Sequence, residues 1–146
     1  MLSKHKYMMK NIVLLLILFA TQVNSQTKKS IDSINQIPYL NFLKNHTQLQ
    51  SVFIKNAINA RKINYSFGEA QSYSKLSLAY YYSGDFEKNL KYSLLAIKIF
   101  EKIDQQESLA KEYGELGYRM KKRSLPKALY YMQRGMKISE KNNFEE

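Results

Sequence analysis

One stretch, residues 73–100, constrains the fold most strongly because it combines two amphipathic helical patterns with a turn between them. Helical spacing puts Tyr73, Leu76, Ser77 and Tyr80 on one face of a first helix, and Phe86, Leu90, Ser93 and Ile97 on one face of a second. Between them, Gly84 can adopt a positive φ and Asp85 can cap the second helix. The stretch therefore predicts two antiparallel helices.

Similar patterns occur on both sides of this pair. We expect helix pairs over about residues 31–63, 69–103 and 105–141. Ala57, Ala96 and Gly135 recur at intervals of 39 residues, which supports a repeat, and Gly135 predicts a close approach of two helices. The predicted fold is all-α, an α-solenoid of about three antiparallel helix pairs.

The central pair resembles a tetratricopeptide repeat. The residues that carry the resemblance are Tyr73, Leu76, Tyr80, Gly84, Asp85, Phe86 and Ala96. Four positions depart from the family pattern: Ser77, Asn89, Ser93 and Glu101 stand where the family has Gly, Ala, an aromatic residue and Pro. The resemblance implies a non-catalytic helical scaffold that binds a peptide or protein.

The resemblance also implies that residues beside the core stripe of each first helix line a concave groove. These are Gln71, Ser74, Lys75, Leu78 and Tyr82 in the central pair, and Lys111, Gly114, Tyr118, Lys121 and Lys122 in the last. Tyrosine offers rigid contact area and lysine offers positive charge, which together suit a partner that carries carboxylates. The alternative is that the tyrosines only pack between neighbouring repeats.

Charge supports a second hypothesis. The formal net charge is +11, and without the first 25 residues 20 basic residues remain against 12 acidic ones, or +8. The densest basic cluster is Arg119, Lys121, Lys122, Arg123 and Lys127, around the turn of the last pair. A solvated turn is one interpretation of this cluster. The alternative function is a basic helical protein that binds polyanions or nucleic acid, although an exported protein is not expected to meet nucleic acid.

The N-terminus predicts export. Residues 1–25 have the pattern of a signal peptide: a basic start, an apolar run over Ile12–Ala20, and small residues before a cleavage site after Ser25. A retained membrane anchor is the competing interpretation, but the run is shorter than the roughly 20 residues that a span needs. We expect a disordered linker over residues 26–30, a helical domain over 31–146, no membrane span in the mature chain, and a periplasmic or envelope-associated location.

Signal sequences followed by long, degenerate repeats resemble the N-terminal sensory regions of bacterial envelope histidine kinases and regulators. That resemblance implies part of a longer signalling protein. After residue 141 no amphipathic capping helix follows. We therefore predict either a longer array or self-association through the exposed apolar face of the last helix pair.

Several local patterns make sharper predictions. Pro38 ends or restarts the first helix, after which Leu40 and Leu43 continue an apolar face. Two segments, Ser66–Glu69 and Asp104–Glu107, have the spacing of capping boxes. The last helix starts near Ser124 and carries Leu125, Ala128, Leu129, Met132 and Met136.

No residue pattern predicts catalysis, a cofactor or a metal site. The chain has no Cys, and His46 is the sole histidine after residue 25; we expect it in an exposed loop. Glu112 and Glu115 lie one helical turn apart, as paired catalytic carboxylates do, but we interpret them as a solvated helix edge. The sequence does not predict an enzyme.

Overall fold

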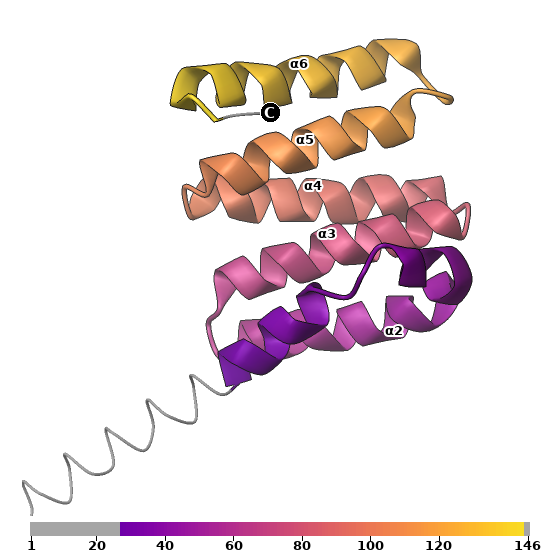
Figure 1. The fold of residues 1–146 in the computed structure, drawn as a ribbon, viewed down its shortest axis with the longest axis vertical. Coiled ribbons are helices and arrows are strands. Elements are labelled where there is room, and N and C mark those ends of the chain that lie inside the picture. The colour runs from indigo at the N-terminus through magenta and orange to yellow at the C-terminus, as the bar shows by residue number, and fades with distance from the viewer. Residues whose placement is uncertain (1–26, 145–146) are drawn as a thin grey trace, which may run out of the picture.

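The computed structural model describes residues 27–144, which form helices and turns without any strand and confirm the all-α prediction. A helix over residues 27–35 precedes the others. These are α2 (Leu40–Lys62), α3 (Ser66–Tyr82), α4 (Phe86–Lys102), α5 (Gln106–Met120) and α6 (Leu125–Asn142). Figure 1 shows them side by side in chain order, so that each helix packs on its sequence neighbours as in a repeat array.

The N-terminal boundary differs from the prediction. Residues 27–30 are the start of a helix and not a disordered linker. This helix is anchored because Ile31 is buried and the Asn35 side chain donates a hydrogen bond to the Gly68 carbonyl at 3.1 Å. The predicted signal peptide, residues 1–25, lies outside the described residues.

Three of the turns between helices have the same backbone conformation. Their middle residues, Asn64, Gly84 and Asp104, all have positive φ, at 55°, 78° and 55°. In each turn the next backbone N–H bonds to a carbonyl five residues earlier, as from Asp85 to Tyr80 at 3.0 Å. This is the pattern of a Schellman motif, which satisfies the last carbonyls of a helix. The turn predicted at Gly84 therefore also occurs at Asn64 and Asp104.

This turn design explains why the two capping-box predictions are wrong. Asp104 occupies the left-handed position, and α5 begins after Gln105 with no side-chain cap. Ser66 is already inside α3, and Glu69 binds Arg61 instead. The cap predicted at Asp85 is present and accepts from the N–H group of Lys88. The last helix starts after Ser124 as predicted, and the Ser124 side chain accepts from the N–H group of Lys127.

The first pair is irregular. The chain breaks at Pro38 as predicted, α2 starts at Leu40, and Asn45 interrupts its helical geometry with φ −121° and ψ 20°. Leu40 and Leu43 are exposed, contrary to the prediction, because this short first segment of α2 turns Phe42 inward. Phe42 stacks on Phe53 with ring centroids 5.6 Å apart.

The last pair is held by unusually close backbones. A Cβ atom on Gly135 would lie 2.7 Å from the Ala110 carbonyl oxygen, and one on Gly117 would lie 2.8 Å from that of Ala128. Both glycines let α5 and α6 approach, as predicted for Gly135. Elsewhere on α6, Leu125, Leu129 and Met136 are exposed, in agreement with the expected apolar face.

Candidate peptide-binding groove

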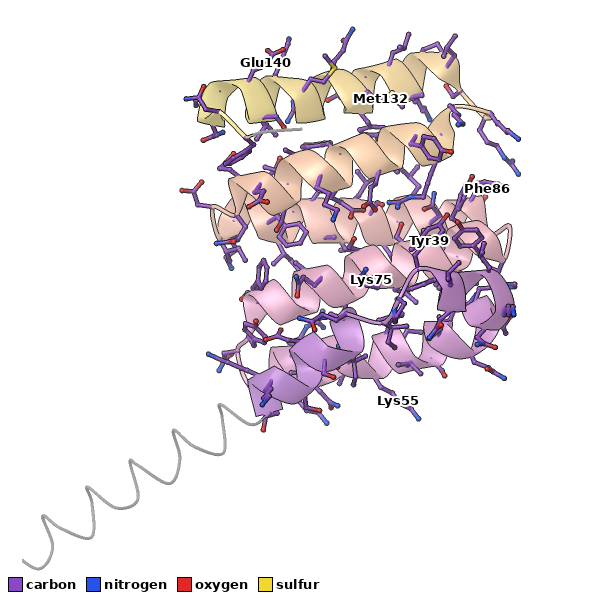
Figure 2. All side chains as sticks on the ribbon, viewed as in Figure 1. Tyr39, Lys55, Lys75, Phe86, Met132 and Glu140 are labelled. Atoms are coloured by element: carbon purple, nitrogen blue, oxygen red, sulfur yellow. The ribbon has the colours of Figure 1, made fainter. Side chains whose placement is uncertain are left out.

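A groove of about 740 Å³ runs between the N-terminal segment, α3 and α5. Gln36 and Tyr39, in the segment around Pro38, border the groove on one side. Figure 2 labels two of the lining residues, Tyr39 and Lys75. The remaining lining residues come mainly from the two parallel helices: Gln71, Ser74, Lys75, Leu78, Tyr81 and Tyr82 on α3, and Glu107, Ser108, Lys111, Glu112, Glu115, Tyr118 and Arg119 on α5, with Asn35 and Phe100.

Most of the predicted groove residues line this space. Those that do are Gln71, Ser74, Lys75, Leu78, Tyr82, Lys111 and Tyr118. They share it because α3 and α5 are successive first helices of two pairs, and residues at helical spacing form a continuous stripe on each.

Three predicted residues lie elsewhere. Gly114 is half-buried at the contact with α6, where its backbone nitrogen would be 3.1 Å from a Cβ on Gly135. Lys121 and Lys122 are exposed in the turn that follows α5, and the Lys121 ammonium lies 3.6 Å from the Tyr118 ring centroid. The helical stripe fails there because α5 ends at Met120.

One end of the groove is aromatic. Tyr39 meets Tyr82 edge-on with centroids 5.6 Å apart, and Tyr81 meets Tyr82 in the same way at 5.4 Å. Tyr81 also contacts Phe86 at 6.0 Å. These contacts fix the rings at the C-terminal end of α3, where they form a rigid apolar surface with polar hydroxyls. Sequence reasoning missed Tyr39 because the residue follows Pro38 and lies between two helices, outside the helical stripes that were expected to line the groove.

Buried charges form the floor of the groove, and here the prediction of a solvated edge is wrong. Glu112 is 2% exposed and Arg119 is 4% exposed. The Arg119 Nη2 atom lies 3.0 Å from Glu112 Oε1, and its Nη1 lies 3.1 Å from Glu115 Oε2. Ser74 of α3 donates to Glu112 Oε2, and Ser93 of α4 donates to Glu112 Oε1 at 2.5 Å.

We call Ser74, Ser93, Glu112 and Arg119 the charged junction, because it joins α3, α4 and α5. Burial raises the pKa of the Glu112 carboxyl, while Arg119 and the two serine hydroxyls oppose that shift. The junction links α3 and α5, the two helices that line the groove, and its Arg119 also pairs with Glu115 outside the junction.

Three of the four departures from the repeat pattern, Ser77, Asn89 and Ser93, belong to the same polar layer. Ser77 Oγ lies 2.8 Å from Asn89 Oδ1 and 2.8 Å from Ser93 Oγ, and all three residues are buried. Three polar residues, at positions that hold Gly, Ala and an aromatic residue in the family pattern, are therefore linked by hydrogen bonds through Ser77. These hydrogen bonds between α3 and α4 are visible only in the tertiary structure. In the sequence, the occurrence of three polar residues at core positions was the one sign of a buried polar network.

The predicted basic cluster is divided in the structure. Arg119 is buried in the charged junction, Lys121 lies over Tyr118, and the Arg123 guanidinium lies 3.8 Å from the Phe86 ring centroid. Lys122 and Lys127 remain exposed. Lys121 and Arg123 are exposed as well, so four of the five residues stay at the surface and only Arg119 is withdrawn from the cluster.

Within residues 27–144, no group of three His, Cys, Asp or Glu side chains is placed to hold a metal ion. His46 lies inside α2 and is half-buried, not in an exposed loop. His46 follows Asn45, the residue with non-helical geometry, and so lies at the kink in α2.

Comparisons with known proteins give no relative. No family model, no curated protein and no solved structure matches the chain. Among the described helices, none is both long enough and apolar enough to cross a membrane.

Proposed function

We propose that this protein is a non-catalytic helical-repeat scaffold of the tetratricopeptide type, whose groove binds a segment of another polypeptide. The observation that supports this most strongly is the groove itself, an open space of about 740 Å³ bordered by the first helices of successive pairs. Its aromatic end and polar floor offer an extended chain both apolar contact and hydrogen bonds. The net positive charge favours an acidic partner.

Two wider proposals rest on the sequence resemblance. An exported, periplasmic or envelope-associated location follows from the signal-like residues 1–25. A sensory role in a longer signalling protein follows from the similarity to envelope kinases and regulators. Fractionation of cells that produce a C-terminally tagged chain tests the first, because an exported protein is released with the envelope fraction and loses its N-terminal residues.

Selection of displayed random peptides of about twelve residues on the immobilised full chain tests groove binding. Tyr118 and Tyr130 make a matched pair of variants, since they are 55% and 53% exposed but only Tyr118 lines the groove. We expect peptides selected on the wild type to bind the Tyr130→Ala variant unchanged and to bind Tyr118→Ala at least tenfold more weakly. Equal binding to both variants would place the peptide site outside the groove.

Polyanion binding remains the alternative function. The burial of Arg119 against Glu112 counts against it, because one of the five charges of the basic cluster is no longer at the surface. Heparin retention measured at low and moderate salt distinguishes the two functions: polyanion binding falls steeply with salt, whereas peptide binding in a partly apolar groove does so much less.

Self-association through α6 is a separate proposal. Leu125, Leu129 and Met136 expose a row of apolar side chains on its outer face. Sedimentation velocity of the full chain and of Leu129→Glu tests it, since a contact through this face is expected to dissociate in the variant.

A further inference from the structure

The middle of the groove holds a half-buried lysine that has no acidic partner. Lys75 projects from α3 into the groove lining. Among residues 27–144 the ion pairs within 4 Å involve Arg61, Lys88, Arg119 and Arg134, and none involves Lys75 or Lys111. The Lys75 ammonium is therefore partly removed from water, and no carboxylate of the described residues lies within 4 Å of it.

The neighbouring carboxylates are already engaged. Arg119 binds both Glu112 and Glu115, at 3.0 Å and 3.1 Å. Glu107 is the third acid of the groove, but it is exposed and lies one turn before Lys111 on α5. Burial lowers the pKa of Lys75 and the nearby Lys111 lowers it further, whereas Glu115 and Glu112 act in the opposite direction.

We propose that the polypeptide bound in the groove presents one carboxylate side chain to Lys75. This inference rests on the proposed function and specifies its partner. A carboxylate at Lys75 would form a charge-assisted hydrogen bond in a site that is already partly dehydrated, where such a bond is stronger than at an exposed lysine. Lys111 faces the same part of the groove and adds to the attraction.

The charge balance favours a single carboxylate over a polyanion. Glu107, Glu112 and Glu115 also line the groove, so a ligand with a row of negative charges would be repelled by them. One carboxylate between uncharged residues avoids those contacts. Nucleic acid binding is thus an outcome that would contradict the proposal.

The geometry also specifies the spacing of the ligand. The Ser74 to Glu112 hydrogen bond sets α3 beside α5 next to Lys75, and the aromatic end at Tyr82 lies seven residues further along α3. At about 1.5 Å per residue this distance is roughly 10 Å, which an extended peptide covers in about three residues. We therefore expect an apolar or aromatic side chain about three residues from the carboxylate.

Peptide selection on two variants of the full chain tests the proposal. The display library of random peptides of about twelve residues is selected in parallel on wild type, Lys75→Met and Lys122→Met. Lys122 is the matched control because it is exposed and lies outside the groove. We expect Asp or Glu at one position, about three residues from an apolar side chain, in peptides from the wild type and from Lys122→Met, and no acidic preference on Lys75→Met.

A second measurement uses the strongest peptide and its Glu→Gln or Asp→Asn analogue. The neutral analogue is expected to bind the wild type about tenfold more weakly, and to bind Lys75→Met with less than a twofold difference. Tyr118-dependent peptides with no acidic position would overturn the role of Lys75 while leaving groove binding intact. Failure to select any Tyr118-dependent peptide would overturn both, and a melting curve of Lys75→Met confirms that the variant is folded.

Discussion

Two buried polar layers join neighbouring helices in this molecule, and they differ in charge. The charged junction holds Glu112 and Arg119 beneath the groove. The other layer, which we call the neutral junction, consists of Asn35, Asn56 and Ser72. Asn56 Nδ2 donates to Asn35 Oδ1 and to Ser72 Oγ, each at 3.0 Å, and so links the N-terminal helix, α2 and α3.

The difference shows how a helical array can specify its contacts in two ways. The hydrogen bonds of the neutral junction join amide and hydroxyl groups, which carry no charge, so these bonds do not depend on pH. The charged junction buries a carboxyl group beside a guanidinium, so it depends on the presence of both side chains and on the protonation of Glu112. It also borders the ligand groove, so the more sensitive of the two junctions lies where binding is proposed.

The largest effect is expected from removing one partner of the charged junction. Arg119→Met leaves the Glu112 carboxylate buried without its cation and should lower the free energy of unfolding by about 3–5 kcal/mol at pH 7. Urea unfolding followed by far-UV circular dichroism measures this loss. Lys122→Met, an exposed charge removed from the following turn, is the control and should change stability by less than about 0.5 kcal/mol.

A smaller loss is expected at the neutral junction. Asn56→Ala removes the Nδ2 donor that bonds to Asn35 Oδ1, to Ser72 Oγ and to the Ile31 carbonyl oxygen, and should cost about 1–3 kcal/mol. Asn59→Ala, at an exposed position of the same helix, should be nearly neutral. The same denaturation experiment compares them, and a loss as large as that of Arg119→Met would show that charge does not distinguish the junctions.

The finest distinction is pH dependence. The pKa of Glu112 in the fold is raised above its ordinary value of 4.5, so between 4.5 and the raised value the folded chain holds a proton that the unfolded chain has released. The stability contributed by this group is therefore complete below pH 4.5 and is lost as pH rises through the folded pKa. Relative to Glu112→Gln, the wild type should gain stability as pH falls from 7 to 4.5.

Asn56→Ala supplies the reference for that experiment. Its free-energy difference from the wild type should stay constant over the same pH range, because no titratable side chain is replaced. A wild-type curve that runs parallel to that of Glu112→Gln would contradict the assignment of a raised pKa to Glu112.

Predictions from the sequence were right for features that depend on residues close together in the chain. The turn at Gly84 and the cap at Asp85 follow from residue type, and both occur. Placement of the α3 stripe, including Lys75, follows from helical periodicity. Local reasoning failed at Ser66 and Asp104, where a Schellman turn shifted the helix start relative to the expected cap.

The charged junction lay beyond such reasoning. Glu112 looks like any carboxylate on a helix edge until its partners are known, and Ser74 is 38 residues away from it in the chain. Arg119 is likewise 26 residues from Ser93, to which its Nη2 atom donates at 2.8 Å. A basic residue near a turn was expected to be solvated, but the contact with α4 buries it.

By itself the sequence determined that this chain forms helices in antiparallel pairs, because apolar periodicity and turn residues act within a few positions of each other. Only the tertiary structure decided which charges leave water. That choice depends on side chains from separate helices meeting at hydrogen-bond distance, since a buried ion is stable only beside its partner. In the folded chain, Glu112 pairs with Arg119, and Lys75 lies in the groove with no carboxylate of the described residues within 4 Å.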